Sequence, residues 1–473
     1  MRKINISPEN SIKTYDGIFK GWGTSLCWWA NRVGHSKKLC EDAADLFFDK
    51  EKGLGLNIMR YNIGGGDDPT HNHITRTDSM MPGFLSKDGS WDYTADERQL
   101  NVLEKCYKAA GDDAFVEAFS NSPPYFMTVS GCSSGHLIPV FTNLKRKCTD
   151  DFADYLAHVT DYLQKEKGIK VGSLAPMNEP FTPYWRKNSE KQEGCHVSPG
   201  KRQSELLIAV KKAMLKYGLT DVDLTASDET NTKCAEKAFL RLSKKALKAV
   251  DRISTHTYQD ATPGIGNKCR ESGFDLWMTE TDWSKVRGED PGEMGPALWF
   301  SHKIIEDMNV LQPSAWVIWQ IVASYISKDG YLGRKDMDKM LDLNEGFWGC
   351  AVAEIDKEEY ILTQKYYAFG QFSRYIRPGM KIILVDSNTI AAFNPESKEL
   401  VIVAVNECKA EEAVQFNLKG FSSYSAAQCI RTSGDSNTGE KWAELLPLKI
   451  TDNTLEATLK GNSVTTFILS WRV

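Results

Sequence analysis

The sequence predicts an α/β protein: a (β/α)8 TIM barrel with a side antiparallel β-sandwich domain. The chain has 473 residues, more than one hydrophobic core usually serves, so a large domain and a smaller partner are expected. Eight short apolar runs alternate with amphipathic segments over roughly the first 300 residues, which is typical of a barrel of β/α units. After residue 379 the pattern changes to short alternating runs separated by turn residues, which is typical of a β-sandwich.

The eight predicted barrel strands are apolar runs of strand length, bounded by turn residues. In chain order they cover residues 21–28, 56–63, 114–121, 171–177, 222–227, 252–258, 274–279 and 315–321. Helices are expected between most of them, for example over residues 151–165, 203–217, 232–248 and 296–309. The active site of such a barrel lies at the carboxyl ends of its strands, so the residues that end or follow these runs are the functional candidates.

The predicted sandwich strands cover residues 381–385, 389–393, 400–406 and 464–471, where apolar and polar residues alternate. The first 18 residues are too short and polar to stand alone, and they could add a strand to that sandwich. We therefore expect a barrel domain over residues 19–374 and a side domain made of residues 1–18 and 375–473. No repeat or low-complexity linker separates them, so rigid packing is expected.

Two glutamates end or follow strands among apolar neighbours. Glu179 follows the fourth predicted strand in Leu-Ala-Pro-Met-Asn-Glu-Pro, and Glu280 follows the seventh in Leu-Trp-Met-Thr-Glu-Thr-Asp-Trp. An apolar neighbourhood penalises a charge unless that charge is used or paired. Two such carboxylates are what retaining glycoside hydrolysis requires, one as general acid and base and one as nucleophile. The alternative is a pair of ordinary loop salt bridges.

Other polar residues at strand ends are candidates for substrate contact. The Asn178 amide could bond a sugar hydroxyl beside the reacting carbon, or it could cap a turn. Arg60 ends the second strand, where a guanidinium could hold a nucleophile ionised or form a structural ion pair. His256 and Tyr258 alternate along the sixth strand, so both could face the cavity; a buried histidine bonded to backbone is the competing interpretation.

Aromatic and acidic residues complete the candidate site. Trp28, Trp29 and Trp319 lie near strand ends, where indole rings could stack on pyranose faces or simply pack in the core. Asp67 and Asp68 follow three glycines in the loop after the second strand, and either could bind sugar hydroxyls, as could Asn121. The glycines resemble a phosphate-binding loop only in composition, because no Lys-Ser or Lys-Thr follows.

The chain resembles glycoside hydrolase family 30 over nearly its whole length. The matching segments are Gly-Trp-Gly-Thr-Ser at 21–25, Phe-Ser-Asn-Ser-Pro-Pro-Tyr-Phe-Met-Thr at 119–128, Asn-Glu-Pro at 178–180, His-Thr-Tyr at 256–258, Thr-Glu at 279–280 and the stretch 366–379. The resemblance implies Glu179 as acid/base and Glu280 as nucleophile. Within the family, Trp-Gly-Thr-Ser at 22–25 followed by Trp-Trp-Ala at 28–30, and the run Ser-Asn-Ser-Pro-Pro-Tyr at 120–125, resemble the endo-β-1,6-galactanase branch more than the glucosylceramidase or glucuronoxylanase branches.

The chain departs from the family pattern after its third strand. Many members have Met-Lys where this chain has Met127 and Thr128, and a tryptophan is expected where Phe126 stands. Substrate contacts of the other branches therefore do not carry over at these positions, and neither does an aromatic stacking role for Phe126.

Composition excludes several classes. The net charge of -5, from 58 basic and 63 acidic residues mixed along the chain, offers no stripe for nucleic acid. The 11 cysteines form no CxxC pair, and His71 and His73 lack an evident third ligand, so no metal and no cofactor are expected. Gly131 to Gly135 spell G-x-S-x-G without the strand and helix that a nucleophile elbow needs.

The N-terminus and the lengths of the apolar runs indicate the expected cellular compartment. No signal peptide follows the basic residues at the N-terminus and no run reaches membrane-spanning length, so a cytoplasmic protein is expected, or a secreted one whose signal was removed. No membrane partner is expected, and the sequence leaves the oligomeric state open.

Together these observations predict a retaining β-glycoside hydrolase acting on an oligo- or polysaccharide. The resemblance implies β-1,6-linked galactan, as in arabinogalactan side chains. A β-1,6-glucanase or a β-glucosidase or glucosylceramidase-like enzyme of the same family remains an alternative, because a barrel does not fix the sugar. The non-enzymatic alternative is a carbohydrate-binding protein on an inactive barrel, which would be expected to lack one of the two carboxylates.

Overall fold

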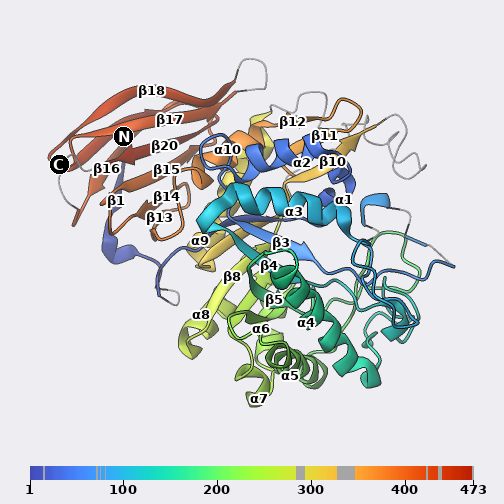
Figure 1. The fold of residues 1–473 in the computed structure, drawn as a ribbon. Helices are drawn as coiled ribbons and strands as arrows, with labels where there is room; N and C mark the ends of the chain where they lie inside the picture. Colours follow the sequence, from blue (N-terminus) through green and yellow to red (C-terminus); the bar gives the residue numbers. More distant parts are fainter. Residues whose placement is uncertain are drawn as a thin grey trace.

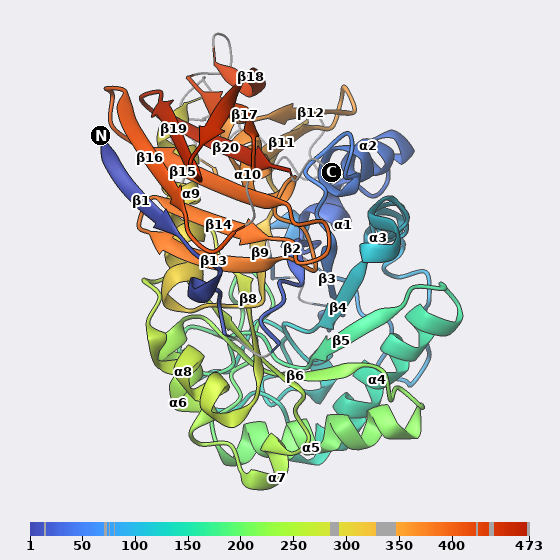
Figure 2. The same ribbon diagram turned by 90° about the vertical axis from the view of Figure 1, so that its left-hand side faces the viewer.

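The computed structural model contains a closed barrel and a second body of β-sheet beside it (Figure 1). It describes residues 1–13, 16–70, 73–74, 76–79, 81–283, 293–327, 347–421, 424–434 and 439–470. The barrel carries its helices on the outside, and the sheet body, built mainly from the C-terminal residues, lies against one flank (Figure 2). The predicted fold class is confirmed.

The barrel is formed by eight parallel strands in chain order, and β2 pairs with β9 to close it. The strands are β2 (Gly21–Ser25), β3 (Ile58–Asn62), β4 (Phe115–Phe119), β5 (Val171–Ala175), β6 (Asp223–Glu229), β7 (Arg252–His256), β8 (Asp275–Glu280) and β9 (Ala315–Gln320). All eight correspond to predicted runs. The loops that leave their carboxyl ends therefore meet at one mouth.

Helices follow the strands and cover the barrel. They are α1 (Trp29–Val33), α2 (Lys37–Ala43), the π-helical turn η2 (Ala44–Phe48), α3 (Glu97–Ala110), α4 (Thr149–Lys165), α5 (Lys201–Lys216), α6 (Thr232–Phe239), α7 (Lys244–Leu247), α8 (Pro263–Ser272), α9 (Met294–Val310) and α10 (Gln364–Ser373). Short 3₁₀ turns are η1 (Pro8–Asn10), η3 (Thr77–Ser79), η4 (Gly111–Asp113), η5 (Tyr125–Met127) and η6 (Arg146–Cys148). The helix expected over 232–248 is two helices, because Ser243 caps a new start by accepting the Ala246 N–H.

The side domain is one continuous nine-stranded sheet that folds into two layers. Its order is β1 (Arg2–Ile6), β16 (Glu412–Leu418), β19 (Thr454–Leu459), β18 (Glu440–Thr451), β17 (Ala426–Ser433), β20 (Ser463–Leu469), β15 (Leu400–Asn406), β14 (Thr389–Phe393) and β13 (Lys381–Asp386). Strand β18 pairs with β17 along most of its length and with β19 at its end, so it passes from one layer to the other.

The N-terminal strand belongs to this side domain. Strand β1 pairs in parallel with β16, and Ile4 and Ile6 enter the apolar core between the two layers. Position 471, which the sequence placed in the last strand, lies outside the described residues. The domain limits of 19–374 for the barrel, and 1–18 with 375–473 for the side domain, stay a prediction.

A small sheet that was not predicted follows the barrel. Strand β10 (Val322–Ile326) pairs in parallel with β11 (Ala351–Glu354), which pairs antiparallel with β12 (Glu359–Leu362). Residues 315–326 form one nearly continuous apolar run, so the break between β9 and β10 at Ile321 leaves little trace in the sequence pattern.

The main apolar core lies between the strands and the helices, while the barrel interior is partly charged. Arg60, Glu117 and Arg252 point inward and are essentially unexposed. Since buried charges require partners, this interior is a network of ion pairs that leads up to the mouth. Among the described residues, no helix has the length and apolarity to cross a membrane.

Candidate active site

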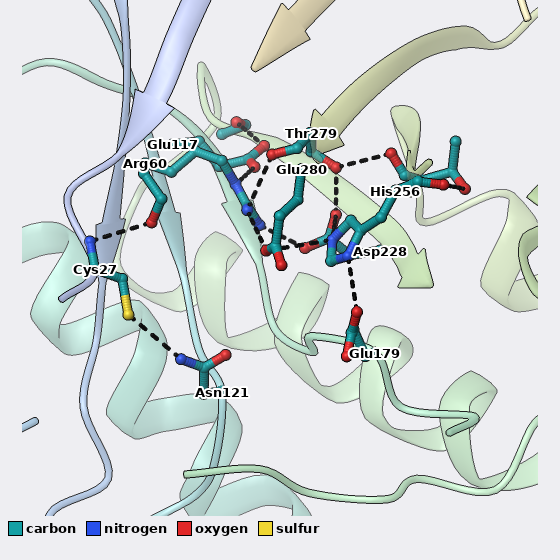
Figure 3. Close-up of polar contacts among 12 residues, drawn as sticks. Cys27, Arg60, Glu117, Asn121, Glu179, Asp228, His256, Thr279 and Glu280 are labelled. Atoms are coloured by element: carbon teal, nitrogen blue, oxygen red, sulfur yellow. Dashed lines mark hydrogen bonds and ion pairs between the residues drawn. The ribbon is translucent and has the colours of Figure 1, made fainter. Parts of the chain in front are cut away.

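The two glutamates come together at the barrel mouth (Figure 3). Glu280 is the last residue of β8, and Glu179 lies four residues beyond the end of β5. Each of these residues is almost fully buried, with 4% of its surface exposed. A carboxylate oxygen of Glu179 lies within 4.8 Å of one of Glu280. Two strands far apart in the sequence therefore present a close carboxyl pair.

Glu179 is held by its backbone as well as by its side chain. Its φ of 46° is in the left-handed region, and its N–H donates to the Asp228 carbonyl at 2.8 Å. The Tyr184 hydroxyl donates to one carboxylate oxygen, and His256 Nδ1 lies 3.1 Å from the other. Because Tyr184 is 47% exposed, this side of Glu179 faces the rim of the mouth.

Glu280 faces hydrogen-bond donors from two other strands. Arg60 Nη1 donates to Oε2 at 3.2 Å, and the Tyr258 hydroxyl donates to Oε1 at 2.7 Å. Burial raises the pKa of Glu280 to about 7, the nearby charge of Glu179 adds to the rise, and His256 and Arg60 oppose it. The Glu280 carboxyl therefore changes its protonation state in the neutral range.

Arg60 ties this carboxylate to the barrel interior. Its guanidinium bonds Glu117 at 3.0 Å, Asp228 at 2.5 Å and the Thr279 carbonyl at 3.1 Å. Burial opposes the charge, but the three carboxylates Asp228, Glu117 and Glu280 more than offset it and raise the Arg60 pKa. A guanidinium with fixed partners on three strands is a rigid cation beneath Glu280.

His256 lies between the two glutamates. Its Nε2 is 3.2 Å from Asp228 Oδ1 and 3.6 Å from Glu280 Oε2, while Nδ1 faces Glu179. Burial opposes protonation, but the charges of Glu280 and Asp228 raise the His256 pKa to about 10. The imidazole is therefore a cation at neutral pH, and it links both carboxylates.

The structure brings most of the other candidates to the same mouth. Asn178 and Asn121 are buried, and the side-chain oxygen of each lacks a hydrogen-bond partner, as does the Trp28 indole nitrogen. Such unpaired buried groups are expected where a polar ligand binds. Trp28 and Trp319 pack edge to face with ring centroids 5.1 Å apart, in a cluster that includes Tyr258.

Trp29 is placed apart from this cluster. It begins α1, is fully buried against Phe47, and donates its indole N–H to the Ser25 carbonyl at 2.8 Å. With no exposed ring face, its position suits core packing rather than stacking on a sugar. The strand ends at Ser25, so the chain has already turned into the helix by this residue.

The acidic loop after β3 lies at the edge of the mouth. Asp67 Oδ2 is 2.7 Å from His73 Nδ1, and Asp68 accepts hydrogen bonds from Thr70. His73 Nε2 in turn lies 3.0 Å from Cys132 Sγ, so Asp67 and Cys132 occupy opposite nitrogens of one ring. His71 lies outside the described residues.

Sequence reasoning missed several residues of the network. Asp228 and Glu229 end β6 much as Asn178 and Glu179 follow β5, so the same strand-end rule could have found them. Glu117 interrupts the apolar strand β4, which is also a readable signal. Tyr184 and Glu193 come from a long loop with no periodic pattern, and nothing in the sequence marks them.

This arrangement can support proton transfer and nucleophilic attack at one carbon. A carboxyl that faces the rim can give a proton, while an opposite carboxylate, held by a guanidinium and a phenol, can attack. Neither step requires a group beyond the side chains described.

The chain is similar to known polysaccharide-degrading enzymes. It is 28% identical to an endo-beta-1,6-galactanase of Hypocrea rufa, over 96% of this chain and 92% of that protein. It is 23% identical to an exo-beta-1,6-galactobiohydrolase of Bifidobacterium longum subsp. longum, over 86% of this chain and 35% of that protein. The catalytic domain of a GH30 xylanase C from Talaromyces cellulolyticus shares the fold, with a TM-score of 0.72 at 17% identity over 99% of this chain and 100% of that one.

A family model described as O-Glycosyl hydrolase family 30 matches residues 1–241, more than half of the chain. The resemblance drawn from the sequence motifs is thereby confirmed, and the protein is a glycoside hydrolase. By its motifs, its fold and its match to the family model, the chain belongs to O-glycosyl hydrolase family 30.

Proposed function

We propose that this enzyme hydrolyses β-glycosides with retention of configuration, by double displacement. The observation that carries the proposal is the approach of Glu179 and Glu280, whose carboxylate oxygens lie within 4.8 Å. Retaining enzymes hold their carboxyl groups about 5–5.5 Å apart, whereas inverting enzymes leave about 6.5–9.5 Å for a water. The closer spacing favours direct attack by one glutamate.

The surroundings support a division of roles. Glu280 accepts from Arg60 and Tyr258, and both contacts stabilise the ionised form that attacks the anomeric carbon. Glu179 faces the rim, where it protonates the glycosidic oxygen as that bond breaks. In the second step Glu179 takes a proton from water, the water oxygen bonds the anomeric carbon, and Glu280 leaves as a carboxylate.

We further propose that the substrate is β-1,6-linked galactan, as in arabinogalactan side chains, cleaved within the chain. The support is the similarity to two enzymes named for β-1,6-galactan cleavage, one of which aligns over nearly the full length. The polar groups left unpaired at the mouth, on Asn121 and Asn178, suit a hydroxyl-rich ligand. We assign to these two asparagines, with Asp67 or Asp68, the recognition of the axial O4 hydroxyl of galactose.

Matched aryl derivatives of β-1,6-galactobiose and β-1,6-glucobiose test the sugar. A site built to bond one hydroxyl leaves its groups unpaired with the epimer, so the gluco compound should react about 10²-fold more slowly or worse. NMR of the first product should show the β anomer. Sizing the products of β-1,6-galactan should show mixed oligosaccharides rather than one short product.

The outcomes separate the parts of the proposal. Equal rates on the galacto and gluco compounds would refute the galactanase assignment and leave the two-glutamate mechanism standing. An α anomer as the first product would refute retention itself. Absence of turnover on every β-linked compound of a defined panel would favour a binding protein.

A further inference from the structure

A cavity of about 710 Å³ opens among the loops at the carboxyl ends of the barrel strands. The loops that follow β3, β4 and β5 form its walls, with Gly65, Asp67, Lys87, Tyr125, Ser133 and Glu193 among the lining residues. Its volume is in the range of sites that bind small ligands. The proton transfers and the nucleophilic attack described above use none of its residues, although Asp67 and Asp68, assigned above to a galactose hydroxyl, are among its lining.

Two observations place this cavity next to the reacting carboxylates. Asn62 lies two residues beyond Arg60 on β3, so both side chains are on the same face of the strand. Asn62 is about 6–7 Å closer to the mouth than Arg60. Its side chain lies close enough to Glu193 to lower the pKa of that carboxyl by hydrogen bonding, against the larger effect of burial. Glu193 and Glu280 both lie near enough to Cys27 for their charges to raise the pKa of its thiol, after the larger effect of burial.

Glu193 is the unusual group in the cavity. Only 1% of it is exposed; one carboxyl oxygen accepts the Gly65 N–H at 3.0 Å, and Oε2 has no partner. Burial raises its pKa well above the ordinary value, and the charge of Asp67 adds to the rise. A neutral buried carboxyl with a free oxygen can donate a hydrogen bond to a ligand, and leaving it unpaired is costly.

Asp67 supplies the complementary acceptor. Its carboxylate is fixed between His73 Nδ1 at 2.7 Å and the Ser133 N–H at 3.4 Å. Cys132 lies against the other nitrogen of His73, at 3.0 Å, which fixes the ring in turn. The cavity thus holds one carboxyl able to donate and one placed to accept, and Tyr125 adds a half-exposed aromatic ring.

The walls of the cavity are rigid. The Tyr155 hydroxyl on α4 donates to the Gly64 carbonyl at 2.6 Å and accepts the Phe84 N–H at 3.2 Å, so one side chain ties together two distant parts of the loop that follows β3. Gly83 lies so close to the backbone of Gly65 that a Cβ there would come within 2.8 Å of its oxygen. Prearranged walls of this kind are expected of a binding site rather than of a gap between mobile loops.

We propose that this cavity binds a second sugar unit of the same glycan chain, and that Glu193 is the group that selects it. The proposal rests on the proposed function, because it assumes a glycan in the catalytic centre. A 1,6-linkage adds a rotatable bond between the rings, so the neighbouring ring can turn sideways into the cavity. Sugar hydroxyls can donate to Asp67 and accept from Glu193, while the ring face packs on Tyr125.

The test compares two substrates with the same leaving group, p-nitrophenyl β-galactoside and p-nitrophenyl β-1,6-galactobioside. In the wild type, kcat/KM for the two-ring substrate should exceed that for the one-ring substrate by about tenfold or more. Glu193→Ala removes the ligand-facing group and should reduce this ratio about tenfold. Glu193→Gln keeps an acceptor for the Gly65 N–H and an N–H that can donate to the ligand as the neutral carboxyl does, so it should largely keep the wild-type ratio. The control is Glu190→Gln, exposed and outside the cavity lining, with an unchanged ratio.

Each other outcome counts against the proposal. An equal loss on both substrates in Glu193→Ala would make Glu193 a structural residue, and no loss on either substrate in that variant would remove the cavity from substrate binding. A fall of the ratio in Glu193→Gln as large as in Glu193→Ala would contradict the role of Glu193 as a neutral donor. A rise in wild-type Tm with calcium chloride that is lost in Glu193→Gln would show a cation site instead. Absence of turnover on both galactosides would refute the proposed function first, and this inference would fall with it.

Discussion

The charge of His256 favours the ionised form of Glu280, the proposed nucleophile. The imidazole is fully buried and lies against Glu179, Glu280 and Asp228, and its pKa is raised to about 10, so it is a cation throughout the neutral range. A cation there favours the carboxylate form of Glu280, whose own pKa burial has raised to about 7. The two shifts therefore depend on each other.

Replacing this cation should move the pH dependence of activity in a defined direction. In His256→Gln the largest influence that lowers the Glu280 pKa is lost, and Arg60 and Tyr258 alone oppose its rise, so Glu280 ionises only at higher pH. The acidic limb of kcat/KM should shift upward by about one pH unit. His302→Gln on α9 serves as the control and should leave the limb in place. A downward shift, or none, would contradict the role given to His256.

The roles of the two glutamates predict different mutant behaviour. A general acid contributes least when the leaving group is already good, so Glu179→Ala should lose about 10²–10⁴-fold on a natural glycan and much less on an activated aryl glycoside. Azide should partly restore the aryl activity by attacking the glycosyl enzyme and yielding a glycosyl azide. Glu280→Ala should lose both activities alike. The same pattern for both variants would mean that the roles are wrong or reversed.

At the scale of elements, the end of β6 positions the turn after β5. The Asp228 carbonyl accepts the Glu179 N–H, and Glu229 Oε2 accepts the Phe181 N–H at 2.9 Å while Gln203 donates to the other oxygen. These bonds hold Glu179 in its left-handed backbone conformation. Burial raises the pKa of Glu229 to about 8, so the carboxyl that holds this turn changes its protonation state near that pH.

That titration predicts how stability depends on pH. A carboxyl whose pKa is raised on folding, here from about 4.3 in the unfolded chain, stabilises the fold most at low pH. The stabilisation is complete below the unfolded value and is lost as the pH rises through about 8. The free energy of unfolding in urea should therefore fall less steeply between about pH 4.5 and 8 in Glu229→Gln than in the wild type. Glu456→Gln, exposed on β19, should keep the wild-type slope.

The elements show what a single sequence can predict. Each barrel strand is a run of local apolar residues, so eight runs were enough to place all eight strands and, with them, Glu179 and Glu280. The contacts of Tyr184 and Glu193 depend on how one long loop folds back over the mouth, and no local pattern encodes that path. Trp29 lies about one helical turn beyond the end of β2, because the strand ends at Ser25 and the chain then turns into α1. That displacement places the side chain in the core instead of at the rim of the mouth.

At the scale of the whole molecule, α10 joins the barrel to the side domain through aromatic rings. Trp442 on β18 lies with its ring 5.3 Å from Tyr366 and 5.1 Å from Tyr367, and the Arg374 guanidinium lies 4.3 Å above it. Its indole N–H donates to the Tyr367 carbonyl at 2.7 Å. A Cβ on Gly370 would lie 2.3 Å from the same ring, so only glycine permits this approach.

Because this contact links the two bodies, they should unfold together, and Trp442→Ala should separate them. The wild type is expected to show one calorimetric transition, since the helix that completes the barrel packs on the sheet of the side domain. Removing the half-buried indole should cost about 2–3 kcal/mol, lower the Tm, and split the transition into two. The matched control is Leu446→Ala on the same strand, where the side chain is 88% exposed and the change should have little effect. Two transitions in the wild type, or an unchanged Tm in Trp442→Ala, would show that the domains fold independently and that the aromatic contact does not couple them.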